Sequence, residues 1–259
     1  MLKSINYQEP SSTGLMLPIY GPPGMGKSSI AAGLAAACEA DGKRAVMGDT
    51  ELGGAAALRR AGCKTSALLD LTVAGGAASA RALSGHVLND ETCGLFVLDT
   101  LTELAVTVLR DAMGDRDMPE MRDYGKRKMG TMQTIRGARD VAASGRPVII
   151  TAQQGTHEIE GLANVFVPEV PKNDRQDLVS QMDAVARLRM ASSVDAEGLG
   201  LEPGARYLDF RTDHRHMTKM RDPEPFFAHG LRADGIWPLN SEDSLDRLYK
   251  AISQKGNES

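Results

Sequence analysis

The stretch "YGPPGMGKSSI", residues 20–30, decides the fold. It contains the pattern G-x-x-x-x-G-K-[ST], in which a glycine-rich loop turns backbone N–H groups toward a phosphate. A short apolar run, residues 14–21, precedes the loop, and a run of helix-forming composition, residues 27–42, follows it. A strand before the loop and a helix after it are the context that phosphate binding requires. The sequence therefore predicts a nucleotide-binding loop inside an α/β fold.

The same pattern predicts which groups touch the nucleotide. Lys27 would reach the β- and γ-phosphates, and the hydroxyl of Ser28 would bind Mg²⁺, so we expect ATP and Mg²⁺ as ligands. The alternative is a chance turn rich in glycine and proline. The residues expected to surround the phosphates are Gly21, Pro22, Pro23, Gly24, Met25, Gly26, Lys27, Ser28 and Ser29.

Composition narrows the class of protein. The chain has 259 residues, of which 42% are hydrophobic and 25% charged, as in soluble globular proteins with a sizeable core. The net charge of −4 gives no general attraction to nucleic acid, so such binding would need a local basic patch. No apolar run approaches the roughly 18 residues of a membrane span, and the three cysteines show no C-x-x-C spacing. We expect a soluble cytoplasmic protein with free thiols and no membrane partner.

Strand-like and helix-like segments alternate along the chain, which predicts a mostly parallel twisted sheet with helices on both faces. The β-rich last third predicts an antiparallel extension, in which the last two strands pair as a hairpin. Two polar segments, 114–127 and 155–176, are expected to be irregular loops. Strands are expected at 14–21, 43–51, 67–73, 93–100, 145–154, 184–191 and 204–213, and helices at 27–42, 55–62, 76–89, 100–113 and 240–254, with a further apolar stripe at helical spacing on Met129, Met132, Ile135, Ala138 and Val141.

A carboxylate that organises the metal is expected at Asp99. It ends the apolar run "LFVLDT", residues 95–100, and the carboxyl end of a parallel strand lies beside the phosphate loop. This is the arrangement called Walker B, although an aspartate here could also cap the following helix.

A second acidic group is needed to activate water. Glu51 ends the strand "VMGDTE" and is the expected general base, with Asp49 as an alternative and Glu103 as a surface residue. AAA+ enzymes place a glutamate directly after the Walker B aspartate. Here Thr100 occupies that position, which disfavours the AAA+ pattern and favours a base on the adjacent strand.

These motifs, in this order, resemble the RecA-like ATPase family, and most of all its compact phage members that act in recombination and single-strand annealing. The likeness covers about residues 14–225 and includes "VIITAQQ", which is similar to the family's strand ending in a polar sensor. It implies that Gln153 lies near the γ-phosphate and that 155–178 is a mobile DNA-contacting loop. We further expect an ATPase domain over 14–240, between a polar, flexible segment, 1–13, and a C-terminal helix and tail, 241–259.

The resemblance extends to partners. "HMTKMRDPEPF" is similar to a short cationic element of the family, so Lys219 and Arg221 would reach the ATP of a neighbouring subunit. An ordinary solvated hairpin end is the alternative. The resemblance implies a homo-oligomer with ATP between subunits, single-stranded DNA and a single-strand-binding protein as partners, and the cytoplasm of a bacterial host if a phage encodes the chain. We expect the core to start near residue 14, without the long N-terminal polymerisation segment of full-length recombinases.

Two basic clusters stand out from the acidic background. The segment "RDYGKRK" combines cations with one aromatic ring, which suits single-stranded DNA, although a solvated helix start would explain the same residues. His157 and Lys172 are weaker candidates for DNA contact. The nucleic-acid candidates are Arg122, Tyr124, Lys126, Arg127 and Lys128 in the first cluster, and Arg211, His214, Arg215 and His216 in the second.

The leading hypothesis is therefore an ATPase whose hydrolysis is stimulated by single-stranded DNA. A regulatory P-loop switch without a DNA role and a small-molecule kinase are the alternatives. The segment "GDRDM", residues 114–118, is a faint sign of a kinase, and the late β-hairpin disfavours it.

Overall fold

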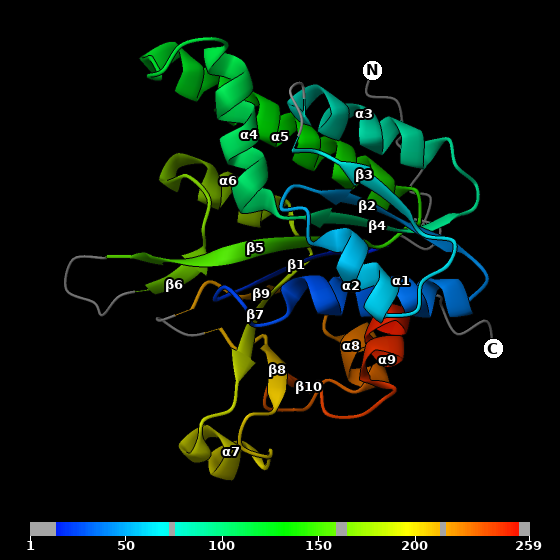
Figure 1. Ribbon diagram of the computed structural model, residues 1–259. Coiled ribbons are helices and arrows are strands. Elements are labelled where there is room, and N and C mark those ends of the chain that lie inside the picture. Colours follow the sequence, from blue (N-terminus) through cyan, green and yellow to red (C-terminus); the bar gives the residue numbers. More distant parts are fainter. Residues whose placement is uncertain (1–13, 73–75, 159–164, 213–215, 254–259) are drawn as a thin grey trace, which may run out of the picture.

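A ten-stranded, mostly parallel sheet organises the protein, as expected (Figure 1). The computed structural model describes residues 14–72, 76–158, 165–212 and 216–253, and the predicted flexible segment 1–13 lies outside them. The strand order along the sheet is β10-β8-β7-β1-β5-β4-β2-β3, with β6 beside β5 and β9 beside β7. The strands are β1 (Met16–Gly21), β2 (Arg44–Asp49), β3 (Ala67–Asp70), β4 (Cys93–Asp99), β5 (Val148–His157), β6 (Val165–Pro168), β7 (Ala184–Met190), β8 (Arg206–Asp209), β9 (Lys219–Met220) and β10 (Ile236–Pro238).

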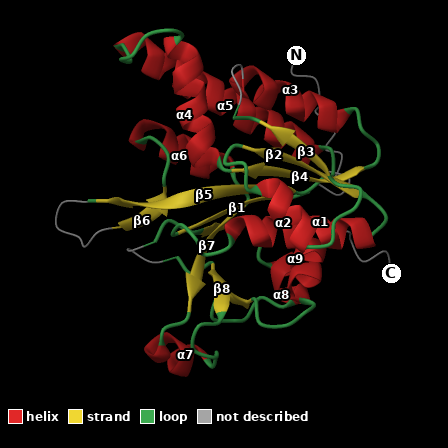
Figure 2. Ribbon diagram, in the orientation of Figure 1, coloured by secondary structure: helices red, strands yellow, loops and turns green. Residues whose placement is uncertain are grey.

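Helices cover both faces of the sheet (Figure 2). Strand residues alternate between two apolar cores: Leu17 and Ile19 of β1 face one core, and Met16 and Tyr20 face the other. The first core contains α1 (Lys27–Ala40), α2 (Gly54–Arg60), α8 (Glu224–His229) and α9 (Ser244–Ser253), and the second contains α3 (Gly76–Leu88), α4 (Leu101–Met113) and α5 (Met121–Ala143). Burial on both faces explains why the central strands are nearly continuous apolar runs.

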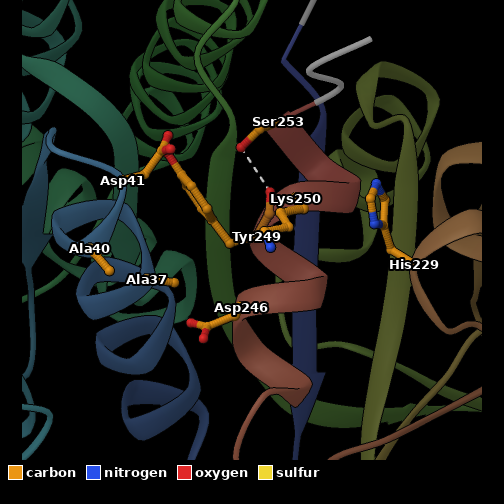
Figure 3. Close-up of a pocket in the computed structure, with 8 residues that line it drawn as sticks. All are labelled: Ala37, Ala40, Asp41, His229, Asp246, Tyr249, Lys250 and Ser253. Atoms are coloured by element: carbon orange, nitrogen blue, oxygen red, sulfur yellow. Dashed lines mark hydrogen bonds between the residues drawn. The ribbon is translucent and has the colours of Figure 1, made fainter. Parts of the chain in front are cut away.

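The C-terminal helix α9 packs against α1 rather than lying apart from the core. Leu248, Tyr249 and Ile252 are buried in the same core as α1. A cavity of 440 Å³ lies between these helices, lined by Tyr249, Lys250 and Ser253 of α9, by His229 and by the end of α1 (Figure 3). The division of the chain at residue 240 stays a prediction.

The expected antiparallel extension is present: β8 pairs antiparallel with β7, and β10 with β8. The connection between β7 and β8 carries a short helix, α7 (Ser193–Leu199). The predicted stripe lies on α5, where Met132, Ile135, Ala138 and Val141 are buried, whereas Met129 is 61% exposed. Among the described residues, no helix combines the length and the apolar composition needed to cross a membrane.

Two loop predictions were wrong. Within 114–127, α5 already begins at Met121. Within 155–176, β5 continues to His157 and pairs antiparallel with β6, and α6 (Lys172–Gln181) follows. The start of α5 is stabilised by Asp123, which is buried. Its carboxylate accepts the N–H of Glu120 at 2.7 Å and pairs with Arg116 at 2.7 Å. Pro and Gly in these segments therefore do not prevent regular structure: Gly125 lies inside α5, and Pro171 directly precedes α6.

Candidate functional site

The phosphate loop has the geometry that its sequence predicts. Gly24 and Gly26 have φ angles of 75° and 92°, a conformation that side chains other than glycine rarely adopt. Lys27 begins α1, and its Nζ donates to the carbonyls of Gly21 and Pro22, each at 3.0 Å. Burial lowers the pKa of Lys27, while the negative charges of Glu51 and Asp99 oppose this shift. A cation is thus held at the loop beside two carboxylates.

Arg206 packs against this loop, a contact that the sequence did not predict. Its Nη1 lies 3.5 Å from the carbonyl oxygen of Met25 and 2.3 Å from the position that a Cβ on Gly26 would occupy. Gly26 is therefore required by its backbone conformation, whereas the exposed Arg206 side chain could move aside for a larger residue.

Asp99 lies at the carboxyl end of β4 with its side chain 1% exposed. Burial raises its pKa, and hydrogen bonds from Thr151 and Ser28 oppose the rise. The alternative role of helix cap belongs to the next residue, because the hydroxyl of Thr100 accepts the N–H of Glu103 at the start of α4. The peptide bond between Asp99 and Thr100 is cis.

Glu51 and Asp49 differ in what their carboxylates contact. The strands β2 and β4 are neighbours, with Asp49 opposite Asp99, so Glu51 reaches the Walker B edge as predicted. Asp49 is buried and accepts the N–H groups of Glu51 and Gly54 at 2.9 and 2.7 Å. Glu51 is exposed, and its Oε1 accepts hydrogen bonds from Thr100 at 3.1 Å and from Gln153 at 3.2 Å. Asp49 thus holds the backbone before α2, and Glu51 as the general base stays a prediction.

Gln153 lies where a residue that senses the γ-phosphate would be expected. The strand β5 lies between β1 and β4, and Gln153 stands opposite Gly21 of the phosphate loop. Its N–H donates to the hydroxyl of Thr102 at 3.0 Å, and its carbonyl accepts the N–H of Glu169 at 2.7 Å. Gln153 thus contacts both the expected base and the segment after β6.

These residues fit ATP and Mg²⁺. The loop offers the positive φ angles that turn N–H groups toward phosphates, and the Ser28 hydroxyl and the Asp99 carboxylate lie within hydrogen-bonding reach of each other. Oxygen ligands of this kind are those that Mg²⁺ prefers. Ser28 and Asp99 would therefore hold the ion, which would supply positive charge beside the β- and γ-phosphates.

Lys219 and Arg221 lie beside β7, the strand that neighbours β1 and its phosphate loop. They flank Met220 on β9, which pairs with the first residues of β7. Lys219 Nζ donates to the carbonyls of Val179, Ser180 and Met182 at 2.9, 3.3 and 2.7 Å, at the end of α6. Arg221 makes longer contacts, 3.4 Å to Asp183 and 3.3 Å to Ser180. Action on a neighbouring subunit stays a prediction for both.

The cluster "RDYGKRK" lies on the first turns of α5, which corrects its placement in a loop. Arg122 pairs with Glu120, and Arg127 pairs with Asp174 of α6 at 3.2 Å and lies 5.6 Å from the ring centroid of Tyr124. Lys126 is exposed, and Lys128 is half-buried. Only part of the predicted DNA-binding cluster is therefore free to reach a ligand.

The other basic candidates are dispersed. Arg211 binds Asp209, and His216 stacks on Phe166 of β6 with the ring centroids 5.6 Å apart. His157 is half-buried at the end of β5. Lys172 begins α6, and its side chain lies outside the described residues, as do His214 and Arg215.

Comparison with known proteins identifies the family. Residues 13–221 match the model of a family described as an AAA domain, and no curated protein matches the chain. The prediction that Thr100 disfavours an AAA-type domain was therefore wrong. A residue other than glutamate after Asp99 does not exclude such a domain. The matched residues include the phosphate loop, the β4 strand that ends in Asp99, and Gln153. The chain therefore belongs to the AAA domain family of P-loop ATPases.

Proposed function

We propose that this ATPase binds single-stranded DNA and assists phage-type homologous recombination or strand annealing. The observation that carries the proposal is the course of β5. The strand runs from Gln153, which contacts Glu51, directly into the hairpin with β6. Loss of the γ-phosphate would therefore shift Gln153, and β5 would transmit that shift directly to the hairpin.

A groove of 630 Å³ beside this hairpin supports the proposal. It lies between α4, the β5–β6 hairpin and the start of α6, and Gln154, Thr156, Arg127 and Arg175 are among its lining residues. The Nε atoms of both arginines are buried and make no hydrogen bond within the described part of the chain. Glu169 also lines the groove and contributes a negative charge. These Nε atoms are buried and Arg127 is paired with Asp174, so the support from this groove is its cationic and polar lining, which suits a phosphate backbone.

Exposed groups on α5 extend this surface. Lys126 is exposed, the side chain of Arg122 is 66% exposed, and Tyr124 is 41% exposed. Positive charge follows a nucleic-acid backbone, and an exposed ring can stack on a base. A local cationic surface on a chain with net charge −4 predicts binding that weakens steeply with salt.

The residues have distinct roles in the proposed hydrolysis. Lys27 and the loop N–H groups hold the phosphates, and Glu51 accepts a proton from the attacking water. Gln153 orients Glu51 and reports the state of the γ-phosphate to β5. Such positioning supplies most of the catalysis in phosphoryl transfer, because there is little covalent chemistry for the protein to do.

The proposal includes a homo-oligomer with ATP between subunits. Arg221 is the better candidate for a cation that acts on the neighbour, since its side chain is 50% exposed, whereas Lys219 is held by three carbonyls. A guanidinium near the γ-phosphate stabilises the charge that develops in the transition state.

The test is Mg²⁺-dependent ATP hydrolysis with and without single-stranded DNA, with Lys27→Ala as the inactive control. We expect DNA to raise turnover several-fold, and ATP to tighten the binding of a fluorescent oligothymidylate. Turnover that is unchanged by DNA, together with no DNA binding in the presence of ATP, would overturn the proposal and favour a regulatory switch. A phosphorylated small-molecule product would favour a kinase.

A further inference from the structure

The hydroxyl of Thr50 fixes the backbone at the end of the Walker B strand. Thr50 is buried between Asp49 and Glu51, and its Oγ1 accepts the N–H of Thr100 at 2.7 Å and donates to the carbonyl of Thr100 at 3.0 Å. The N–H of Thr50 donates to the carbonyl of Asp99 at 2.7 Å. Thr50, which follows β2, therefore makes hydrogen bonds with three backbone groups at the end of β4: the N–H and carbonyl of Thr100 and the carbonyl of Asp99.

The hydroxyl of Thr100 in turn holds the expected base. Thr100 is 1% exposed, and its Oγ1 donates to Oε1 of Glu51 at 3.1 Å while accepting the N–H of Glu103 at 3.2 Å. Both capacities of this hydroxyl are used. Its orientation is thus set by the helix start on one side and by Glu51 on the other.

The two carboxylate oxygens of Glu51 differ in their hydrogen bonds. Oε1 accepts from Thr100 and from Gln153, at 3.1 and 3.2 Å. No hydrogen bond within the described part of the chain goes to Oε2. An exposed glutamate would otherwise lose rotamer freedom when it binds a water. The two hydrogen bonds to Oε1 fix the orientation of the carboxylate and leave Oε2 available to accept a proton from water.

We propose that Thr50 and Thr100 are positioning residues for ATP hydrolysis: Thr50 locks the backbone of Thr100, and Thr100 holds Glu51 by one carboxylate oxygen. The inference rests on hydrolysis at this site and does not require DNA. A base displaced by about 1 Å can lose about 10²-fold in rate. Hence the hydroxyl after Asp99 acts on turnover through Glu51, without touching the nucleotide.

The test compares Thr100→Val, which keeps the shape and removes the hydroxyl, with Thr100→Ser, which keeps the hydroxyl. For Thr100→Val we expect kcat without DNA to fall about 10- to 100-fold, with the KM for ATP and the Kd for ADP within about twofold of wild type. Thr100→Ser should retain kcat within about threefold, because its hydroxyl can make both hydrogen bonds.

Ser192→Ala is the matched control, because Ser192 caps α7 through the N–H of Asp195 at 3.1 Å and lies on an element outside the site. It should lower the melting temperature by an amount similar to Thr100→Val and leave kcat unchanged. If Thr100→Val does not fold, Thr50→Val tests the same idea through the backbone and should reduce kcat selectively.

Three outcomes would overturn the inference: wild-type kcat in Thr100→Val, an equal loss of nucleotide affinity and turnover, or an equal kcat loss in Ser192→Ala. Failure of the DNA proposal gives a different result. In that case wild-type turnover would be insensitive to DNA, while the contrast between Val and Ser at position 100 would persist. A wild-type protein without Mg²⁺-dependent turnover would overturn both.

Discussion

The side-chain amide of Gln153 lies 3.2 Å from Oε1 of Glu51 and so joins the sensor strand to the residue expected to activate water. The next residue, Gln154, faces the other way and accepts from Arg187 at 2.8 Å. The guanidinium of Arg187 lies 4.1 Å from the ring centroid of Phe166 in β6. Adjacent residues of β5 therefore contact Glu51 and, through Arg187, the hairpin strand β6, and this series of contacts supports the proposed coupling of hydrolysis to DNA binding.

Glu51→Gln should abolish turnover without weakening nucleotide binding. The amide keeps the size of the side chain and can still accept from Thr100, but it cannot take a proton from water. Loss of a general base costs about 10²- to 10⁴-fold in rate. Single-turnover hydrolysis and ADP titration measure the two effects separately. A variant with more than a tenth of wild-type kcat would show that another group activates the water.

Asp49→Asn should act on stability more than on chemistry. Its carboxylate accepts the N–H groups of Glu51 and Gly54 at 2.9 and 2.7 Å, and a neutral amide weakens such charge-assisted bonds. We expect a loss of about 1–3 kcal/mol in the free energy of unfolding. Urea unfolding and kcat at a temperature well below the transition provide the measurement. A kcat as low as that of Glu51→Gln would contradict the structural role.

Lys126→Ala and Arg127→Ala should separate a DNA contact from a structural ion pair. Lys126 is exposed, so its loss should change stability by less than about 0.5 kcal/mol, weaken DNA binding and lower the salt dependence of log K by about one. Arg127 pairs with Asp174, whose side chain is 3% exposed, so its loss should cost about 1–3 kcal/mol of stability. Fluorescence anisotropy at several salt concentrations and urea unfolding check both variants. Equal DNA affinity for wild type and Lys126→Ala would remove Lys126 from the proposed surface.

Glu39 should make stability depend on pH. Burial alone would raise its pKa, but hydrogen bonds from the Ser66 hydroxyl and from the N–H groups of Lys64, Thr65 and Ser66 outweigh burial and lower it from 4.5 to about 2. A depressed folded pKa means that the ionised form stabilises the fold. This contribution is complete above pH 4.5 and disappears as the pH falls toward 2. Urea unfolding should show wild type more stable than Glu39→Gln at pH 7, with a gap that narrows below pH 4.5. A gap that stays constant down to pH 3 would contradict this cause.

Local patterns predicted the parts of the fold that local physics determines. The phosphate loop, its flanking strand and helix, and the Walker B strand were predicted because glycine conformation and continuous apolar runs act over a few residues. The neighbouring positions of Glu51 and Asp99 followed from parallel strands that end at one edge.

Long-range contacts explain what the sequence did not reveal. The hairpin strand β6 is a short run whose Phe166 is held by Arg187 and by the hydroxyl of Tyr20, which donates to its carbonyl at 3.3 Å. The contact of Arg206 with the phosphate loop joins residues 181 positions apart. No periodicity within a window of sequence indicates such pairs. The proposed role of Thr100 has the same origin, because its hydrogen bonds with Glu51 and Thr50 join residues 49 and 50 positions apart.

Mixing two inactive variants should test whether Arg221 acts on a neighbouring subunit. Lys27→Ala removes the cation at its own phosphate loop but retains Arg221, and Arg221→Ala has the reverse defect. If ATP lies between subunits, a mixed oligomer contains interfaces with an intact loop from one subunit and an intact arginine from the next. We therefore expect the mixture to hydrolyse ATP faster than the sum of the two proteins assayed alone.

Lys219→Ala is the informative control for this experiment. Its ammonium group is held by three carbonyls at the end of α6, and burial lowers its pKa, so its loss should lower the melting temperature. A defect of that kind lies within the subunit, and mixing with Lys27→Ala should not repair it. Complementation by Lys219→Ala as well would extend the trans role to both cations. Absence of complementation by Arg221→Ala would mean that its contacts with Asp183 and Ser180 are its function and that each subunit completes its own site.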